Sequence, residues 1–336
     1  MIREQVDKLL SAFGSSGDGG DTELLETHIS WVILSGEDVY KIKKPISLHF
    51  LDFSTVEKRK FYCEREVLLN RRLTAGIYLD VVPVSGKSGS FFIGHQAGDV
   101  IDHAVHMRRM DEGRRMDTLL RMGEVTFSEI DKLAAKIAVF HERTDVIREK
   151  DVRDIPDKFA DLGTEEEFLR TSLLMDDRSS ISRAISISDK FSKRHYSRVK
   201  ERIAGGFTRD CHGDLHTGNI FLLDTPQPFD CIEFSDDLRQ TDVLNEVAFL
   251  CMDLDSFGRE DLSQRFLRTY LDIFPALETP EDEQLFIYYK CYRANIRAKI
   301  NSLRARCALT EVGKMVALTE ASKYLTVMND CIQQLQ

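Results

Sequence analysis

The pattern of apolar and polar residues changes its period about one third of the way along the chain. Before residue 110, apolar residues gather in short runs rich in β-branched and aromatic side chains. Residues 28–34 and 39–43 are two such runs, joined by the turn residues Ser-Gly-Glu-Asp, which predicts a β-hairpin. Residues 80–86 and 90–97 predict a second strand pair, and residues 103–110 predict one further strand.

Two helices are predicted within this strand-rich part. Apolar residues recur at helical spacing over residues 54–73, with Ser54 or Thr55 as the N-terminal cap. Residues 1–13 predict a short amphipathic helix, and the glycine- and serine-rich residues 14–20 predict a flexible break.

After about residue 111 the pattern becomes that of long helices. Residues 127–144 place apolar side chains and His141 on one helical face. Further helical patterns occupy residues 165–176, 189–204, 242–255, 259–273, 281–306 and 311–333, and a small β island interrupts them at residues 220–234. This order predicts an α+β protein of two lobes that meet at a cleft.

Composition and charge exclude several classes of protein. The chain of 336 residues has an ordinary apolar content of 42%, and nearly all of its net charge of −10 lies after residue 110. Such a balance does not suit nucleic-acid binding. No apolar run is long enough to cross a membrane, and the N-terminus lacks the pattern of a secretory signal. The seven scattered cysteines include no Cys-x-x-Cys pair, which predicts free thiols in a cytoplasmic protein.

The sequence Cys-His-Gly-Asp-Leu-His-Thr-Gly-Asn-Ile-Phe, residues 211–221, concentrates polar chemistry just before an apolar run. An aspartate such as Asp214 can accept a proton from a hydroxyl nucleophile or orient it. An asparagine such as Asn219 can ligate Mg²⁺, which prefers oxygen ligands and shares them with phosphates. A second carboxylate is expected from Asp230 or Glu233. Together these groups meet the requirements of phosphoryl transfer.

Two simpler interpretations of this stretch stay open. His212, Asp214 and His216 could form a metal site, although zinc ligands usually lie on one helix face or include cysteine. Gly213 and Gly218 interrupt any helix here. The stretch could also be a plain structural loop.

The residues His-Gly-Asp-Leu-His-Thr-Gly-Asn followed by Ile-Phe-Leu-Leu-Asp resemble the catalytic loop of the aminoglycoside phosphotransferase and choline kinase group, which are small-molecule kinases with a protein kinase-like fold. Residues 26–59 and 229–254 further resemble a bacterial branch of that group. Members of the branch are often fused to a C-terminal P-loop domain. Because no Gly-x-x-x-x-Gly-Lys-(Ser/Thr) occurs in this sequence, that domain is expected to be absent.

The resemblance implies a role for each polar residue of the loop. Asp214 would be the catalytic aspartate that accepts or orients the substrate hydroxyl, and Asn219 would ligate Mg²⁺. His212 and His216 would shape the loop rather than touch the substrate.

The second metal ligand departs from the family pattern, which has Ile-Asp followed by an aromatic or aliphatic residue. Glu233, 14 residues after Asn219, follows an apolar residue as the pattern requires. Asp230, 11 residues after Asn219, would face the other side of an extended strand. This favours Glu233 as the ligand and keeps Asp230 as the alternative.

The resemblance also predicts a nucleotide site in the first lobe. Lys41 and Lys43 share one face of a strand because side chains alternate; either could bind the phosphates, and Lys43 is slightly favoured. Glu66 would pair with that lysine. Adenine would bind backbone groups at a hinge, near the residues Met107, Arg108, Arg109 and Met110.

The resemblance therefore implies a nucleotide-binding lobe over residues 1–107, a hinge at about 107–111 and a helical lobe over 112–336 that carries the catalytic loop 212–219. The expected activity is transfer of phosphate from ATP, with Mg²⁺, to a hydroxyl of an amino sugar, a choline-like alcohol, a sugar or a nucleoside. The acidic clusters at 164–168 and 280–284 would suit a cationic substrate, although such runs are usually solvated surface.

A second hypothesis is a nucleotide-binding pseudokinase or regulatory module without turnover. It rests on the glutamate at a usual aspartate position and on the absence of a Gly-x-Gly-x-x-Gly loop. A protein kinase is disfavoured by His-Gly-Asp in place of His-Arg-Asp. The sequence does not predict the oligomeric state.

Overall fold

The structure is a computed structural model that describes residues 1–15, 22–48, 51–94, 98–173 and 179–336. Contacts divide the chain into two compact units. The sheet unit comprises Met1–Leu119 and Gly218–Arg239, and the helical unit comprises Leu120–Thr217 and Gln240–Gln336. The predicted break at residues 14–20 lies largely outside the described residues. The hinge at 107–111 stays a prediction.

The sheet unit is built on a six-stranded antiparallel sheet with the strand order β1-β2-β3-β8-β6-β7. These strands are β1 (Thr22–Glu26), β2 (Ser30–Ser35), β3 (Asp38–Lys43), β6 (Tyr78–Lys87), β7 (Ser90–Ile93) and β8 (Asp99–Arg108). The predicted hairpin is confirmed: β2 pairs with β3 from Ser30 opposite Lys43 to Ser35 opposite Asp38. Its turn contains Gly36, whose φ of 58° lies in the left-handed region that glycine adopts without strain.

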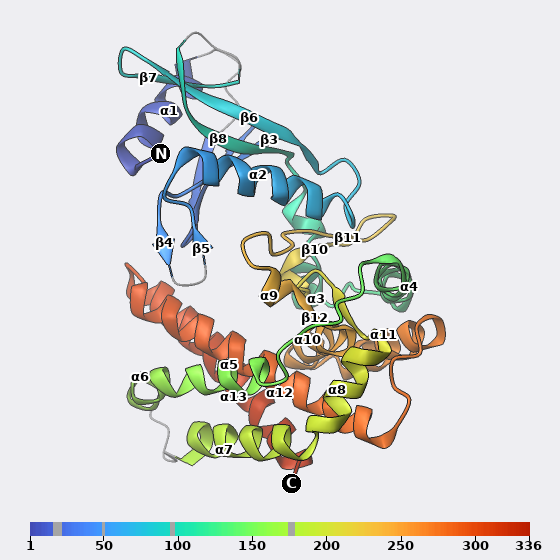
Figure 1. Cartoon of the computed structure of the whole chain (residues 1–336). Helices are drawn as coiled ribbons and strands as arrows, with labels where there is room; N and C mark the ends of the chain where they lie inside the picture. The colour runs from blue at the N-terminus through green and yellow to red at the C-terminus, as the bar shows by residue number, and fades with distance from the viewer. Residues whose placement is uncertain (16–21, 49–50, 95–97, 174–178) are drawn as a thin grey trace. The chain divides into compact units, whose positions relative to one another are not determined.

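Two helices, α1 (Arg3–Ser15) and α2 (Val56–Asn70), pack on this sheet. Ala104 belongs to the apolar cluster that includes Val6 and Leu9 of α1, whereas the next residue, Val105, belongs to the cluster that includes Val67 of α2. Because neighbouring residues of a strand point to opposite faces, the sheet lies between the two helices, as the trace of this unit in Figure 1 shows. Thr55 caps α2 by accepting a hydrogen bond from the backbone N–H of Lys58.

Shorter elements complete the sheet unit. They are the strands β4 (Ser47–Leu48), β5 (Leu51–Asp52), β10 (Ile220–Phe221) and β11 (Gln227–Pro228), the 3₁₀ turns η1 (Glu112–Arg114) and η3 (Thr217–Asn219), and the helices α3 (Met116–Met122) and α9 (Asp236–Arg239). The unit boundaries pass through η3 and α3. The predicted β island at 220–234 is a hairpin of two-residue strands that ends at Pro228.

The helical unit contains the long helices that the second half of the sequence predicts. Its elements are α4 (Phe127–Arg143), α5 (Asp154–Ala160), η2 (Asp161–Glu165), α6 (Glu166–Ser172), α7 (Ser179–Arg194), α8 (Tyr196–Gly205), α10 (Val243–Ser256), α11 (Glu260–Ile273), α12 (Pro280–Cys307), α13 (Glu311–Gln334) and the paired strands β9 (Thr208–Asp210) and β12 (Gln240–Asp242). The single helix predicted over residues 189–204 is wrong. The chain changes direction at His195, where α7 ends and α8 begins.

Helix α10 is the centre of this unit. It is buried from Val243 to Leu254 and packs against α11, α12 and α13 (Figure 1). A helix that is buried on all sides has no polar face to spare, so the polar residues it carries need partners inside the protein. Those residues anchor the loop described below. Within the described residues, no helix has the length and apolar character needed to cross a membrane.

Candidate functional site

The sheet unit contains a cluster of two lysines and three carboxylates. Lys41 and Lys43 lie on the same face of β3 and both reach Glu66 of α2. The Lys41 Nζ to Glu66 Oε1 distance is 2.8 Å, and the Lys43 Nζ to Glu66 Oε2 distance is 2.7 Å. Each lysine also contacts a second carboxylate: Lys41 Nζ lies 2.7 Å from Asp230 Oδ1, and Lys43 pairs with Glu233.

The expectation that Asp230 and Glu233 face opposite sides of a strand is wrong. Strand β11 ends at Pro228, and Asp230 has a φ of 62°, so the backbone here is not extended and side chains do not alternate. The bend is held by two hydrogen bonds: the N–H of Asp230 donates to the Tyr78 hydroxyl (3.1 Å), and the N–H of Cys231 donates to Asn70 Oδ1 (2.9 Å). Both acids therefore reach the lysine pair.

The two halves of this cluster differ in exposure. The side chains of Lys43 and Glu66 are fully buried and that of Glu233 is 4% exposed. Lys41 is 13% exposed and Asp230 is 44% exposed. A ligand in solvent can therefore meet Lys41 and Asp230 without displacing the buried contacts of Lys43.

The charges of the cluster shift its titration. Burial alone would lower the pKa of Lys41, but Asp230, Glu66 and Glu233 raise it well above its usual value. Burial opposes ionisation of Glu66, yet Lys41 and Lys43 lower its pKa to about 2. Burial and the charge of Glu66 raise the pKa of Glu233, although Lys43 opposes this. Two lysines face three carboxylates, so the ionised cluster has an excess negative charge that a cation would offset.

Asn219 lies next to this cluster at the open end of the β10–β11 hairpin. Ile220 pairs with Pro228, and the N–H of Phe229 donates to the backbone oxygen of Asn219 (2.9 Å). Asn219 is thus opposite the residue that precedes Asp230. The hairpin therefore brings two candidate oxygen ligands of a hard cation to one place in the fold.

In the helical unit, the loop that contains Asp214 is tied to α10. Glu246 accepts hydrogen bonds from the N–H groups of His212 (3.0 Å) and Gly213 (2.6 Å). Asp253 accepts hydrogen bonds from the N–H and the hydroxyl of Thr217 (2.9 and 2.6 Å). Glu246 and Asp253 are seven residues apart and share one face of the helix, so α10 holds the loop at two points.

Further contacts complete this support. His141 Nε2 lies 2.9 Å from Glu246 Oε1, and its Nδ1 lies 2.9 Å from the Tyr270 hydroxyl. Arg293 donates to the backbone oxygen of Gly213 (3.0 Å). Gly213 has a φ of 89°, a conformation that residues with a side chain rarely adopt. The loop thus keeps a bent backbone with its polar groups paired.

Asp214 itself is one-third exposed, and its Oδ2 lies 3.5 Å from His216 Nε2. Burial would raise the pKa of Asp214, but the charges of His216 and Arg297 hold it well below the usual range. Asp214 is therefore ionised at neutral pH and able to accept a hydrogen bond from a hydroxyl.

The two loop histidines are buried. His212 Nδ1 accepts a hydrogen bond from the N–H of Asp214 (3.3 Å). Within the described part of the chain, only His141, Cys211 and Glu246 bring three ligand atoms within 4.8 Å of one another. Two of these residues are already engaged in the loop support, so the arrangement favours a structural role. The histidine metal site considered from the sequence has no such grouping.

The residues expected at the hinge contribute to the sheet and its core. The N–H of Arg108 donates to Ile77 (2.8 Å), and the N–H of Arg109 donates to Glu37 (2.6 Å). Met107 and Met110 pack against the α2 side of the sheet. The amides of Arg108 and Arg109 are therefore engaged within the sheet unit.

Sequence reasoning missed the residues that hold the Asp214 loop. Asp242 caps α10, and Glu246 lies in the first turn of that helix; neither of them was assigned to the loop from the sequence. Asp253, Arg293 and Arg297 were not singled out. The sequence did contain a signal for the acids of α10, because charged residues stand there within an otherwise apolar helix. Buried charges require partners inside the protein.

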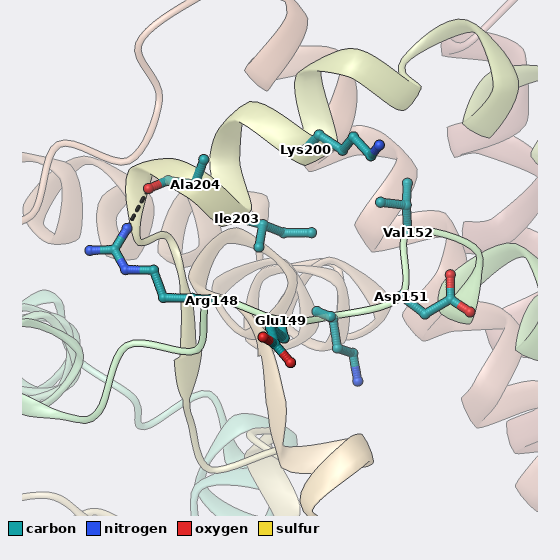
Figure 2. A pocket seen from close by; sticks show the side chains of 8 residues that line it. Arg148, Glu149, Asp151, Val152, Lys200, Ile203 and Ala204 are labelled. Atoms are coloured by element: carbon teal, nitrogen blue, oxygen red, sulfur yellow. Dashed lines mark hydrogen bonds between the residues drawn. The ribbon is translucent and has the colours of Figure 1, made fainter.

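A separate cavity of about 720 Å³ lies in the helical unit between α8 and the segment before α5 (Figure 2). It is lined by Arg148, Glu149, Lys150, Asp151, Val152, Lys200, Ile203 and Ala204. Arg148 donates to the backbone oxygen of Ala204 across one side. The cavity contains none of the predicted site residues and mixes charges of both signs.

No family model matches the chain. The uncharacterized protein Rv2004c of Mycobacterium tuberculosis and the uncharacterized protein Mb2027c of Mycobacterium bovis are each 32% identical to it over 320 residues, which cover 93% of this chain and 60% of the relative. The chain therefore spans about three fifths of the length of the curated relatives it matches.

Two solved structures resemble this one. A choline kinase from Cryptosporidium parvum Iowa II aligns with a TM-score of 0.55 at 10% identity, covering 94% of this chain and 90% of that chain. A mutant of aminoglycoside 2′-phosphotransferase-IIIa in its GDP complex aligns with a TM-score of 0.51 at 14% identity, covering 98% and 96%. The chain has their fold. The predicted bilobal, protein kinase-like α+β fold is confirmed.

Proposed function

We propose that this chain is an ATP- and Mg²⁺-dependent phosphotransferase that acts on a hydroxyl group of a small molecule. The observation that carries the proposal is the paired lysine and glutamate of β3 and α2, next to a solvent-facing aspartate on the β10–β11 hairpin. A shared fold alone does not establish a reaction. The proposal therefore rests on these groups and on the anchored Asp214 loop.

In this proposal Lys41, rather than Lys43, binds the nucleotide phosphates. Lys41 is partly exposed and Lys43 is fully buried between Glu66 and Glu233. A phosphate can replace Asp230 as a partner of Lys41, because Asp230 is itself close to solvent. Lys43 then acts as a positioning residue that keeps Glu66 in place.

Asn219 and Asp230 are the proposed Mg²⁺ ligands. Their positions on the hairpin and the excess negative charge of the cluster support this assignment. Glu233 is 4% exposed and paired with Lys43, which favours a role in positioning over metal binding. When bound, Mg²⁺ would neutralise charge on the phosphates.

Asp214 is the proposed catalytic base. It is ionised, partly exposed and placed on a loop with a fixed backbone. A carboxylate in this state can orient the acceptor hydroxyl and take its proton as phosphate is transferred. The positioning of Asp214 depends on Glu246, which binds the two preceding amides.

The proposal is tested first by nucleotide binding. A ligand that binds the folded state raises the melting temperature. We expect ATP with Mg²⁺ to raise it, Asp230→Asn to remove the dependence on Mg²⁺, and Glu233→Gln to keep it. Glu64→Gln, at an exposed position of the same helix as Glu66, is the matched control.

Turnover separates an enzyme from a nucleotide-binding module. Release of ADP is measured with a panel of small hydroxyl compounds, and Asp214→Asn is expected to abolish any acceptor-dependent release while retaining ATP binding. Mg²⁺-dependent binding without turnover on any acceptor would favour the pseudokinase hypothesis. Absence of ATP binding would overturn the proposal.

A further inference from the structure

The surroundings of Asp214 in the helical unit contain two arginines to which the proposed function assigns no role. Arg297 and Arg304 are seven residues apart on α12, so they lie on one face of the helix about 10 Å apart along its axis. Arg297 Nη1 lies 3.4 Å from His216 Nε2, whose distance to Asp214 Oδ2 is 3.5 Å. One histidine therefore connects Arg297 to the proposed base.

Within the described residues Arg297 makes no direct ion pair; burial would lower its pKa, but Tyr324 and the charges of Asp253 and Asp214 raise it. Its guanidinium lies over the ring of Tyr324, 5.3 Å from the centroid, and its buried Nε has no hydrogen-bond partner within the described residues. The nearby acid Asp253 is already bound by Thr217 and by the Tyr324 hydroxyl (2.6 Å). A buried donor without a partner is unfavourable, which indicates that this group is available for a ligand.

Arg304 is exposed, and within the described part of the chain it has no hydrogen bond and no ion pair. Desolvation and the charge of Arg297 lower its pKa, against opposing contributions from Asp214 and Glu320. Glu320 is also engaged, because its Oε2 lies 3.4 Å from Lys323 Nζ. Two like charges thus lie on one face of α12, and the charge of Asp214 acts on both; a bound anion would offset their mutual repulsion.

One acid of each cluster that suggested a cationic substrate is buried and ion-paired inside the helical unit. Glu165 of the first cluster is 3% exposed and pairs with Arg306 (3.0 Å). Asp282 of the second cluster is fully buried and pairs with Arg198 (2.7 Å) and Arg202 (3.0 Å). These acids are therefore not free to attract a cation to Asp214.

We propose that the acceptor molecule carries an anionic group, a carboxylate or a phosphate, which Arg297 and Arg304 bind while its hydroxyl meets Asp214. The planar guanidinium group matches both anions through paired hydrogen bonds. This inference rests on the proposed function, because it takes Asp214 as the base. It replaces the expectation of a cationic acceptor with an anionic one.

The test uses four hydroxyl compounds that differ in charge: glycerate, glycerol 3-phosphate, glycerol and choline. Binding to the full chain is measured by calorimetry without nucleotide, and ADP release is measured separately with ATP and Mg²⁺. We expect one of the two anions to bind more tightly than glycerol and choline. Comparison of glycerate with glycerol 3-phosphate distinguishes a carboxylate site from a phosphate site.

Variants test whether the arginines form the site. Arg304→Ala changes an exposed side chain and is expected to weaken binding of the preferred anion at least tenfold, whereas Arg304→Lys should retain part of it. Arg268→Ala removes an exposed arginine on α11 and should leave binding unchanged. Arg297→Lys keeps the positive charge but loses the planar guanidinium group. This variant is also expected to bind the preferred anion more weakly.

Several results would overturn this inference. They are tighter binding of choline or glycerol than of either anion, no binding of either anion at millimolar concentration, and anion binding that Arg304→Ala leaves intact. ATP binding is scored independently. Arginine-dependent anion binding without ATP binding would support the anion site and contradict the kinase proposal. ATP turnover with choline as acceptor would support the kinase proposal and contradict the anion site.

Discussion

Replacing Lys43 with methionine should destabilise the protein far more than the same change at Lys41. Lys43→Met leaves the buried carboxylate of Glu233 with no lysine in contact and leaves Glu66 with only Lys41. Removing one partner of a buried ion pair costs about 3–5 kcal/mol. Since methionine fills much of the lysine volume, the lost charge dominates this figure.

Lys41→Met removes contacts that are closer to solvent. Glu66 keeps Lys43, and Asp230 is 44% exposed, so water can solvate it. The expected loss is about 1–2 kcal/mol, between the values for exposed and buried pairs. The same variant should lose ATP binding, because Lys41 is the proposed phosphate ligand. Of the two lysines on this strand face, Lys43 is thus expected to contribute mainly to stability and Lys41 mainly to nucleotide binding.

The pH dependence gives a further signature of Lys43→Met. The pKa of Glu233 is already raised by burial and by Glu66, and loss of Lys43 raises it more. A carboxyl with a raised pKa in the folded state stabilises the fold below its unfolded pKa and loses that contribution as the pH rises. The loss in free energy of unfolding of Lys43→Met relative to wild type should therefore be smaller at pH 5 than at pH 8.

The assay is urea denaturation followed by circular dichroism, at both pH values, with ATP binding measured in parallel. Lys60→Met, an exposed lysine of α2, controls for the loss of a lysine as such. Equal destabilisation by Lys41→Met and Lys43→Met, or a larger loss in free energy of unfolding of Lys43→Met at pH 5, would refute the reasoning.

Three further predictions concern the loop, acid stability and the thiols. Glu246→Gln should lower turnover by at least about tenfold with little change in ATP binding, because it weakens the charge-assisted bonds that hold the Asp214 loop; unchanged kcat would contradict this. The pKa values of Glu66 and Glu246 are each lowered to about 2, so their stabilisation is present above about pH 4.5 and lost as the pH falls toward 2; acid titration of Glu246→Gln should show a smaller loss than wild type. All seven cysteines are free and only Cys307 is exposed, so a thiol reagent should modify about one thiol quickly in the native protein and seven after denaturation; rapid modification of several native thiols would contradict this.

Much of the local structure could be predicted from the sequence. The hairpin of β2 and β3, the helix capped by Thr55 and the long helices of the second half follow from the period of apolar residues and from turn and cap residues. These signals depend on interactions between residues a few positions apart, so they can be recognised in the sequence alone. The break at His195 was missed because the apolar pattern continues across it.

The chemical roles within the site depended on tertiary structure. The sequence named both lysines and both acids, but the exposure of Lys41 and the burial of Lys43 arise from contacts with residues as far away as Asp230 and Glu233. The left-handed backbone at Asp230 depends on hydrogen bonds to Tyr78 and Asn70 in distant segments.

The possible role of the arginines near Asp214 also could not be predicted from the sequence. On the sequence, Arg297 and Arg304 are two charges on a long helix, where a solvated face is the ordinary interpretation. Their lack of direct ion pairs within the described residues became visible only after folding had paired Glu165, Asp253 and Asp282 with other groups. Local periodicity determined which elements form, and only the packing of distant segments decided which charges are buried and paired and which can meet a ligand.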